Sequence, residues 1–399
     1  MNPWPVARTA LRRGWRSALA MVVLVALATG IGVGIGVLER ALRHGAAQAA
    51  DAFDLVIGAP GGPTQLVMTS VYLQPDTVTL MDGAILNRIM AEPEVAWASP
   101  IGFGDQWHGY PIAGVAEALV TQGGRRGVNE GRLAVEDSEA VLGSDVPLPI
   151  GAKIEPQHGL IETHEGHVHA ESAYTAVGRL APTGTPWDRA ILVPIESVWE
   201  IHGLGNGHPA GVESIGPPWV NPPGTPAVVV KPRSIAGAYQ LRAKYRTAAS
   251  TAVFPGEVLA SLFRTMGDVR AMLSGMALAT SVLVVGAVFL AFGALVTARA
   301  RDHAVLRAIG ASPGFVLAAL WLELGAVLTV GVALGTALGW AGARVAAVAL
   351  REASHVSLGV SLGWADLGLA ASILAGGLVA AAIPAVMGGR TLPGAALKQ

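Results

Sequence analysis

Three long stretches of the chain contain no charged residue: 17–38, 271–298 and 367–389. An Arg, Lys or Asp at the centre of a membrane helix costs roughly 2.5–3.5 kcal/mol on insertion. A charge-free run of about 20 residues is therefore the pattern of a membrane span. A helix of about 22 residues, such as 17–38, is about 33 Å long, which is enough to cross the hydrocarbon.

A fourth apolar stretch, residues 308–343, is interrupted only by Glu323. Its first part contains Gly310 and Pro313, which suit a turn better than the centre of a span. We therefore expect the third span at 320–345, with Glu323 at the membrane–water interface. A buried carboxylate with a functional role is the alternative at this position. The pattern thus predicts four transmembrane helices, arranged as one plus three.

Basic residues flank these runs and predict their orientation. Four arginines precede the first run, three lie in 299–312, and Arg390 and Lys398 follow the last run. By the positive-inside rule, the segments 1–16, 299–312 and 390–399 are cytoplasmic. The 231 residues from 39 to 269 are then extracytoplasmic, in a multi-pass protein of the inner (plasma) membrane.

The N-terminus allows a second interpretation. A basic start, an apolar run and the small residues Ala47 and Ala49 also resemble a signal peptide with its cleavage site. The apolar run is longer than such peptides need, and the small residues lie about ten positions beyond it. We therefore expect an uncleaved anchor.

Composition agrees with two environments. Charged residues make up 14% of the chain, against about a quarter in a soluble domain. Segment 39–269 holds 15 Lys and Arg against 24 Asp and Glu, whereas the rest holds 12 against 4. The net charge of −1 predicts no nucleic-acid partner, and the absence of cysteine does not identify the redox compartment.

Segment 39–269 is rich in Pro and Gly and carries short apolar runs bounded by turn residues, which favour strands. The strands expected are 54–58, 190–194 and 227–231. The helices expected are 39–52, continuing the first span, 79–91, and 234–270, leading into the second. We predict an α+β domain inserted between the first and second spans.

Glycines repeat every four residues in two spans. Gly331, Gly335 and Gly339 do so in the third, and Gly30 and Gly34 in the first. Small residues at this spacing line one helix face and let two backbones approach closely. We expect these glycines to pack helices together rather than to line a substrate path.

Histidines gather in the predicted outer domain, where eight of the ten lie between 44 and 208. A His-rich loop, 158–171, alternates imidazoles with glutamates, and both suit zinc and similar divalent ions. The candidate ligands are His158, His164, His167, His169, His202 and His208. No CxxC or HExxH motif specifies the geometry, and a solvated loop without metal is the alternative.

Motifs for catalysis are not found in the sequence. It contains no GxxxxGK[ST] phosphate loop and no GxSxG nucleophile motif. We therefore expect no enzymatic activity and no bound cofactor other than the possible zinc.

Residues 299–312, Arg-Ala-Arg-Asp-His-Ala-Val-Leu-Arg-Ala-Ile-Gly-Ala-Ser, resemble the signature cytoplasmic loop of FtsX-like permeases, the family that includes MacB-like ABC transporter permeases. Asp302 stands where that family more often has Glu. The ending 384–397 resembles the family's C-terminus. Segments 53–67, 182–186 and 196–202 resemble a subgroup that often carries a His-rich extracytoplasmic loop.

The resemblance implies the permease subunit of an ATP-binding-cassette transporter, paired as a homodimer with separate cytoplasmic ATPase subunits. Motion of the ATPase would reach the outer domain, a MacB-like periplasmic core domain, through the helices. The residues implied in ATPase coupling are Arg301, Asp302, Leu306, Arg307, Gly310 and Ala311. The simpler interpretation is that the arginines only orient the chain and meet lipid headgroups.

Two other functions stay open. A mechanical signalling protein would switch an extracytoplasmic partner such as a cell-wall hydrolase, and a metal-handling assembly would use the His-rich loop for zinc. Membrane lipid and an extracytoplasmic adaptor or substrate protein are further expected partners. The size of segment 39–269 favours transport over signalling.

Overall fold

The computed structural model describes residues 2–74, 76, 79–158, 173–212, 214–265, scattered residues between 275 and 297, 299–354 and 358–389. It divides into two compact units. The helical unit comprises residues 1–43, 265–350 and 358–399, and the sheet unit comprises 44–264 and 351–357.

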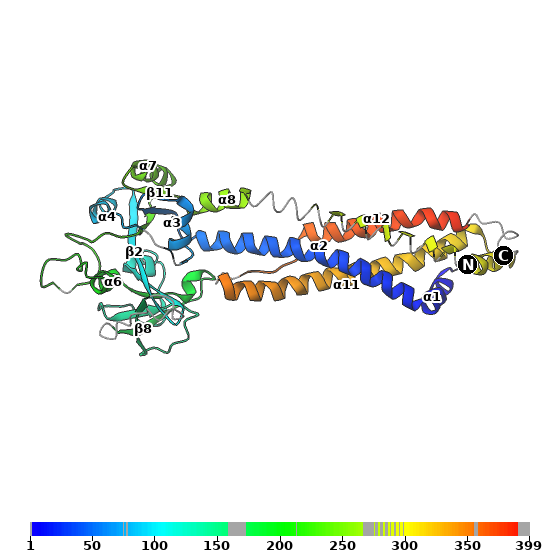
Figure 1. Cartoon of the computed structure of the whole chain (residues 1–399), viewed down its shortest axis with the longest axis horizontal. Helices are drawn as coiled ribbons and strands as arrows, with labels where there is room; N and C mark the ends of the chain where they lie inside the picture. Colours follow the sequence, from blue (N-terminus) through cyan, green and yellow to red (C-terminus); the bar gives the residue numbers. More distant parts are fainter. Residues whose placement is uncertain are drawn as a thin grey trace. The chain divides into compact units, whose positions relative to one another are not determined.

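The helical unit combines long apolar helices with shorter helices that carry charged residues (Figure 1). The helices are α1 (Trp4–Arg13), α2 (Trp15–Ala50), α10 (Ala300–Ala308), α11 (Pro313–Ser354) and α12 (Trp364–Gly389). Within the described residues, Trp15–Ala50 and Pro313–Arg351 are long and apolar enough to cross a membrane, and Trp364–Ala380 is a shorter apolar helix. Apolar side chains such as Val25, Leu324 and Leu328 form the core of this unit.

These helices cover part of the predicted pattern. The first and third predicted spans lie within α2 and α11, and the fourth lies within α12. Most of the second, 271–298, is outside the described residues. The structure thus supports two spanning helices, and the full set of four stays a prediction.

In the sheet unit, the described strands form one mixed sheet. Its order is β11-β1-β10-β2-β3-β9-β5-β8-β4, with β6 beside β8 and β7 beside β2. The pairs β3–β9 and β5–β8 are parallel, and the other pairs are antiparallel. The strands are β1 (Leu55–Gly58), β2 (Val95–Trp107), β3 (Tyr110–Val115), β4 (Val128–Gly131), β5 (Glu139–Leu142), β6 (Lys153–Ile154), β7 (Gln157–His158), β8 (Tyr174–Leu180), β9 (Ile191–Pro194), β10 (Ala227–Pro232) and β11 (Thr251–Val253).

Both faces of this sheet are covered, because neighbouring residues of one strand enter different cores. Val56 of β1 packs in one apolar cluster, whereas Leu55 and Ile57 pack in another. The first cluster includes residues of α3 (Pro63–Ser70) and α8 (Pro255–Thr265). The second includes residues of α4 (Gly83–Met90), α6 (Ile195–Ile201) and α7 (Ile235–Tyr245). The short helix α5 (Glu117–Val120) and a 3-10 turn at Pro186–Arg189 complete the unit.

The sheet unit agrees with the expected elements except in one segment. The expected strands correspond to β1, β9 and β10, and the helix expected at 79–91 is α4. The helix expected over 234–270 is wrong, because β11 divides it into α7 and α8. A turn in which Thr247 N donates to Ser250 O (2.9 Å) ends α7, and the β-branched Thr251 and Val253 then pair with β1.

The carboxylate of Glu139 holds the segment before β5 in place by hydrogen bonds. We expect the stability of the sheet unit to fall when this carboxylate is protonated at low pH. Both oxygens of Glu139 accept from the Arg132 guanidinium, and Oε2 also accepts from Val135 N at 2.8 Å. The side-chain hydrogen bond from Arg132 is the main cause that lowers the pKa of Glu139 to about 2. Because the folded-state pKa lies below the unfolded value, this stabilisation is complete above pH ~4.3 and is lost as the pH falls towards about 2.

We therefore expect Glu139→Gln to lower the melting temperature of the full chain at pH 7 and to flatten its decline below pH ~4.3. The hydrogen bonds to the Glu139 carboxylate contribute about 1–2 kcal/mol, a value at the low end for a charged group because Arg132 is half exposed. For a domain of this size, that loss lowers the melting temperature by roughly 2–8 °C. Calorimetry in detergent measures both effects. The neighbouring Glu136→Gln is the control, and an equal drop in that variant would contradict the assignment.

Candidate functional site

The segment 299–312, here called the coupling segment, is a short helix with a defined stop. Ala311 N donates to Leu306 O (3.0 Å), and Gly310 N donates to Arg307 O (3.1 Å). These two bonds form a Schellman motif, in which the residue after the helix takes a positive φ. Gly310 has φ +100°, a conformation that residues with a Cβ rarely adopt. The Leu-Arg-x-x-Gly-Ala pattern is thus explained as a helix terminus.

The next helix begins immediately. Ser312 precedes α11, and its Oγ accepts from Phe315 N at 3.2 Å. Pro313 follows as the first helical residue, where its missing N–H costs nothing. Only residues 309–312 therefore separate α10 from α11.

One face of α10 presents apolar side chains to solvent. Val305 is 49% exposed and Ile309, four residues later, is 77% exposed. Residues four apart lie on the same face of a helix. Arg301 and Asp302 are exposed as well, whereas Ala304 is buried. The exposed face therefore combines charged residues with an uncovered apolar pair.

A second face of α10 borders a cleft shared with α1. The cleft has a volume of about 380 Å³. Asp302 and Leu306, again four apart, line it from α10. Its other lining residues are Pro5, Val6, Thr9, Ala10, Arg13 and Arg299. Two of the implied coupling residues therefore face α1, and Leu306 is only partly exposed.

Arg299 anchors this region to α11 and to the end of α1. Its Nη1 lies 2.8 Å from Glu323 Oε1, and its Nη2 donates to Ala10 O at 3.2 Å. A Cβ on Gly14 would stand 2.2 Å from Arg299 Nη2, so the guanidinium of Arg299 lies directly against the junction of α1 and α2. Glu323 is 5% exposed and ion-paired within the helical unit. Its side chain thus lies in the interior of this unit, and its depth in the membrane stays a prediction.

The glycines of α11 lie against those of α2. A Cβ on Gly335 would stand 2.5 Å from Ala26 O, and one on Gly339 would stand 2.4 Å from Gly30 O. At Gly331 the nearest atom would be Val25 Cβ, at 2.8 Å. These contacts are to backbone or to a β-branched side chain, which cannot rotate away. The two helices are therefore in backbone contact along this stripe.

The candidate metal ligands do not assemble in the part of the chain that the structure describes. His164, His167 and His169 lie outside the described residues, and the backbone of His158 pairs with β2 in β7. His202 Nδ1 lies 2.7 Å from Val198 O, and His208 Nε2 lies 3.7 Å from Glu196 Oε1. No group of three potential ligands occurs among the described residues. Zinc binding by the loop stays a prediction.

Sequence reasoning did not identify Val305 or Ile309 as site residues. Val305 and Ile309 are apolar residues in a segment expected to be cytoplasmic, and their spacing of four was the available signal.

Comparison with known proteins identifies the C-terminal region. Residues 274–392 match the family model described as FtsX-like permease C-terminal. No curated protein matches the chain. Solved structures similar to it include the periplasmic region of MacB from Actinobacillus actinomycetemcomitans, at 8% identity and a TM-score of 0.33, over 53% of this chain and 94% of that one. Another is the extracellular domain of the noncanonic ABC-type transporter YknZ from Gram-positive bacteria, at 10% identity and a TM-score of 0.30, over 50% and 98%.

The two structural likenesses have low TM-scores, so the family assignment depends on the C-terminal match and on the coupling segment, which lies inside it. Residues 274–392 thus match the C-terminal region of FtsX-like permeases, and the resemblance seen in residues 299–312, which lie inside this match, is confirmed.

Proposed function

We propose that this chain is the permease subunit of an ATP-binding-cassette transporter, and that it transmits the motion of a separate cytoplasmic ATPase to the sheet unit. The observation that carries the proposal is the coupling segment, which lies inside the matched FtsX-like domain and folds as a helix with an exposed apolar pair. An exposed apolar pair rimmed by charge is typical of a protein-binding surface.

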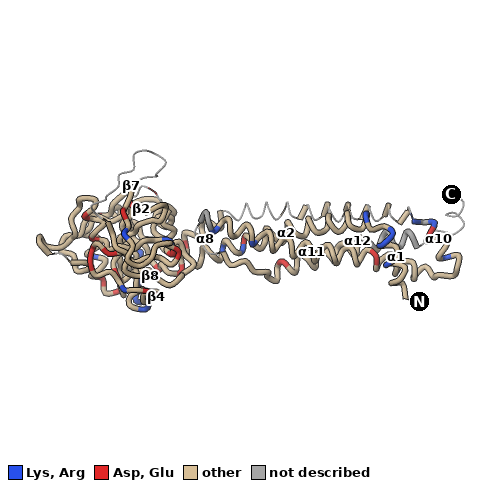
Figure 2. The backbone as a smooth tube through the Cα atoms, turned by 90° about the horizontal axis from the view of Figure 1, so that it is seen from below, with Lys and Arg blue, Asp and Glu red and all other residues tan. Residues whose placement is uncertain are grey.

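The proposed topology has four spans, with α1, α10 and the C-terminus in the cytoplasm and the sheet unit outside. Figure 2 supports this for the helical unit, because α2, α11 and α12 carry few charges and basic residues gather near α1 and α10. The basic residues there include Arg12, Arg13, Arg16, Arg299 and Arg301. This distribution follows the positive-inside rule.

In this mechanism the ATPase contacts α10 and moves it during its cycle. The short connection at 309–312 transfers the displacement to α11, and the bond from Arg299 to Ala10 O transfers it to α1, which is joined to α2 by the single residue Gly14. Helix α2 is continuous over 36 residues, about 54 Å. Because a hydrogen-bonded helix is stiff along its axis, α2 is a suitable lever towards the sheet unit.

Further partners follow from the same proposal. Two copies of the chain would pair with two ATPase subunits, lipid would surround the apolar helices, and an extracytoplasmic adaptor or substrate protein would meet the sheet unit. The arginines near α10 are compatible with orienting the chain at the same time. The substrate would be handled outside the membrane, since Glu323, the charged residue within the predicted third span, is paired with Arg299.

The test is co-purification of the full chain with a candidate ATP-binding-cassette ATPase, sought first among the products of the neighbouring genes. We expect a stable complex in detergent and a rate of ATP hydrolysis that changes when the chain is added. An ATPase that neither binds the chain nor responds to it would contradict the proposal.

A further inference from the structure

Helix α1 has one exposed face that carries a tryptophan and two arginines. Trp4, Arg8 and Arg12 are spaced four residues apart and therefore lie on one side of the helix. Trp4 is 45% exposed, and both arginines are exposed. Ala7 and Leu11, also four apart, pack instead against the apolar core of the helical unit. The side formed by Trp4, Arg8 and Arg12 is here called the free face.

The cleft with α10 lies on another side of α1. Pro5, Thr9 and Arg13, again four apart, line this cleft, and Asp302 of α10 lines it with them. The acidic side chain of the cleft is therefore beside Arg13. No ion pair joins Arg8 or Arg12 to an acid among the residues that the structure describes. The two guanidinium groups of the free face thus keep their charge available to an external anion.

The free face is next to the start of the predicted first span. Gly14 alone separates α1 from α2, and Figure 1 shows α1 turned away from the axis of α2. Trp15 is 57% exposed, and the Arg16 guanidinium lies over its ring, 5.7 Å from the centroid. Tryptophan is enriched where membrane and water meet. In the proposed topology these residues therefore lie at the level of the cytoplasmic lipid headgroups.

We propose that the free face of α1 binds an anionic phospholipid of the cytoplasmic leaflet, with the headgroup phosphate at Arg8 and Arg12 and with Trp4 against the lipid surface. Residues 1–38 contain four arginines and no acidic residue. Such a basic cluster, directly on the cytoplasmic side of a membrane helix, attracts anionic lipid. Guanidinium groups also form charge-assisted, bidentate hydrogen bonds to phosphate.

The composition of the face favours a lipid over other anions. A soluble phosphate would use the two arginines, but it would leave the exposed tryptophans in water. An acidic protein segment is disfavoured because α2 places this end of the chain at the membrane surface. A zwitterionic lipid has the phosphate but adds a cationic group, which two arginines repel. An anionic lipid matches both the charge and the aromatic residues.

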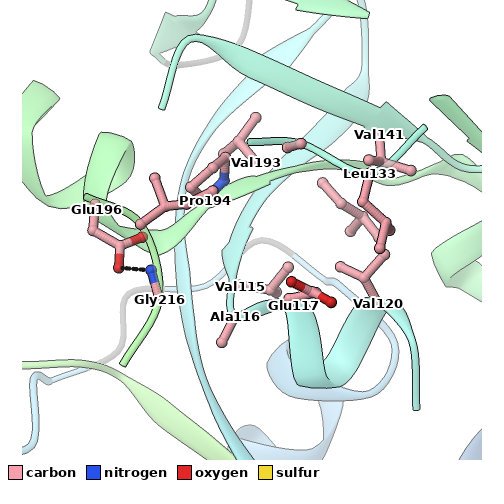
Figure 3. A pocket seen from close by; sticks show the side chains of 13 residues that line it. Val115, Ala116, Glu117, Val120, Leu133, Val141, Val193, Pro194, Glu196 and Gly216 are labelled. Atoms are coloured by element: carbon pink, nitrogen blue, oxygen red, sulfur yellow. Dashed lines mark hydrogen bonds between the residues drawn. The ribbon is translucent and has the colours of Figure 1, made fainter. Parts of the chain in front are cut away.

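The pocket described in the sheet unit does not suit such a lipid. Its volume is about 60 Å³, which is too small for a phospholipid headgroup. The Glu196 carboxylate at its edge accepts from Gly216 N at 2.7 Å, as Figure 3 shows, and also from Trp219 Nε1 at 2.6 Å. An acidic, already bonded group repels an anionic headgroup. Lipid selectivity of the full chain would therefore report on the helical unit.

The proposal rests on the proposed function only in its topology, in which α2 crosses the membrane and α1 lies on the cytoplasmic side. It does not involve the ATPase. Binding measured in detergent does not depend on either, because detergent has no leaflets and no ATPase is present. Failure of lipid binding and failure of the proposed function are therefore distinguishable, since cysteine accessibility and ATPase co-purification test the latter.

Native mass spectrometry of the full chain in detergent, titrated with dioleoylphosphatidylglycerol, tests the proposal. We expect the chain to bind this lipid at least about tenfold more tightly than dioleoylphosphatidylcholine, which has the same acyl chains. Soluble glycerol phosphate should not displace the bound lipid, because it lacks the apolar part that Trp4 contacts.

Paired variants assign the binding to the free face. Replacing both arginines (Arg8→Gln, Arg12→Gln) should weaken phosphatidylglycerol binding at least about tenfold, since each arginine near an anionic lipid contributes roughly fivefold. Replacing both by lysine keeps the charge and should stay within about threefold of the wild type. The matched control (Arg13→Gln, Arg125→Gln) removes the same charge from the cleft side and from an exposed site of the sheet unit. It should also stay within about threefold.

Four results would overturn the proposal. The first is equal affinity of the wild type for the two lipids, and the second is displacement of the lipid by glycerol phosphate, which would indicate a site for a free anion. The third is an equal loss in the control and in the double glutamine variant at Arg8 and Arg12. The fourth is tighter binding of hexaglutamate than of phosphatidylglycerol, which would assign the free face to an acidic protein partner.

Discussion

Replacing Gly339 by leucine is expected to prevent the helical unit from folding. A Cβ at this position would stand 2.4 Å from Gly30 O and 3.1 Å from Gly30 Cα, and both are backbone atoms. The clash is relieved only if α2 and α11 separate, which also removes the close contacts at Gly335. Overpacking of a well-packed core costs about 1–3 kcal/mol when side chains adjust, and a backbone clash costs more.

The same helix supplies the matched control. Gly342, three residues later, has no atom within 4 Å of its ideal Cβ position. Leucine there is a better helix former than glycine by roughly 0.8 kcal/mol, so Gly342→Leu should fold as the wild type does. Size-exclusion chromatography and thermal melting in detergent measure both variants. Equal yield and stability of Gly339→Leu and Gly342→Leu would show that the glycine stripe does not hold the two helices together.

Replacing Val305 and Ile309 by aspartate is expected to abolish ATPase binding without unfolding the chain. Both side chains are about half exposed or more, so the charge is placed in water in the free chain. In a complex the two carboxylates would be buried without partners, at several kcal/mol. We expect co-purified ATPase to fall at least about tenfold, since 1.4 kcal/mol already corresponds to a factor of ten.

Two further variants separate docking from other effects. Val212→Asp makes the same chemical change at an exposed site of the sheet unit and should leave ATPase binding intact. Leu306→Ala removes a side chain that lines the cleft with α1. It should weaken the transmission of motion more than binding. Full ATPase recovery with the Val305→Asp, Ile309→Asp double variant would exclude this face as the docking surface.

The helix boundaries in the coupling segment are readable from the sequence in retrospect. Gly310 after a helical stretch, followed by Ser312 and Pro313, is the pattern of a helix stop and a new start. We nevertheless expected a loop there, because the segment is short and lies between two apolar runs. The helix is present because a Schellman motif and a serine cap satisfy its terminal backbone groups locally. Attention to these residues would have predicted α10.

Pairings between distant residues were not predictable. Arg299 and Glu323 are 24 residues apart, and Arg40 and Asp366 are 326 apart, yet each pair is in contact. Gly36 and Gly363 leave room for the second pair. Charge alone does not reveal such partners, since any acid is compatible with any base until the helices are packed. The expected position of Glu323 at the membrane interface took no account of Arg299.

Local patterns predicted the buried strands well and β11 poorly. Runs such as 227–231 are apolar on both faces, which is the pattern of a central strand covered on both sides. In contrast, β11 has three residues and depends on pairing with β1, which is far away in the sequence. We expected a helix across β11 because the local sequence there gives only a weak preference for a strand. The strand forms because its pairing with β1 outweighs that local preference.

The central claim is that α10 faces the cytoplasm while the sheet unit lies outside. The chain has no cysteine, so a single introduced cysteine reports on one position. Ile309→Cys and Val212→Cys place this reporter at exposed sites of the two units. A membrane-impermeant maleimide applied to intact spheroplasts should label Val212→Cys at once and Ile309→Cys only after lysis. Labelling of Ile309→Cys in intact spheroplasts, or of Val212→Cys only after lysis, would contradict the account.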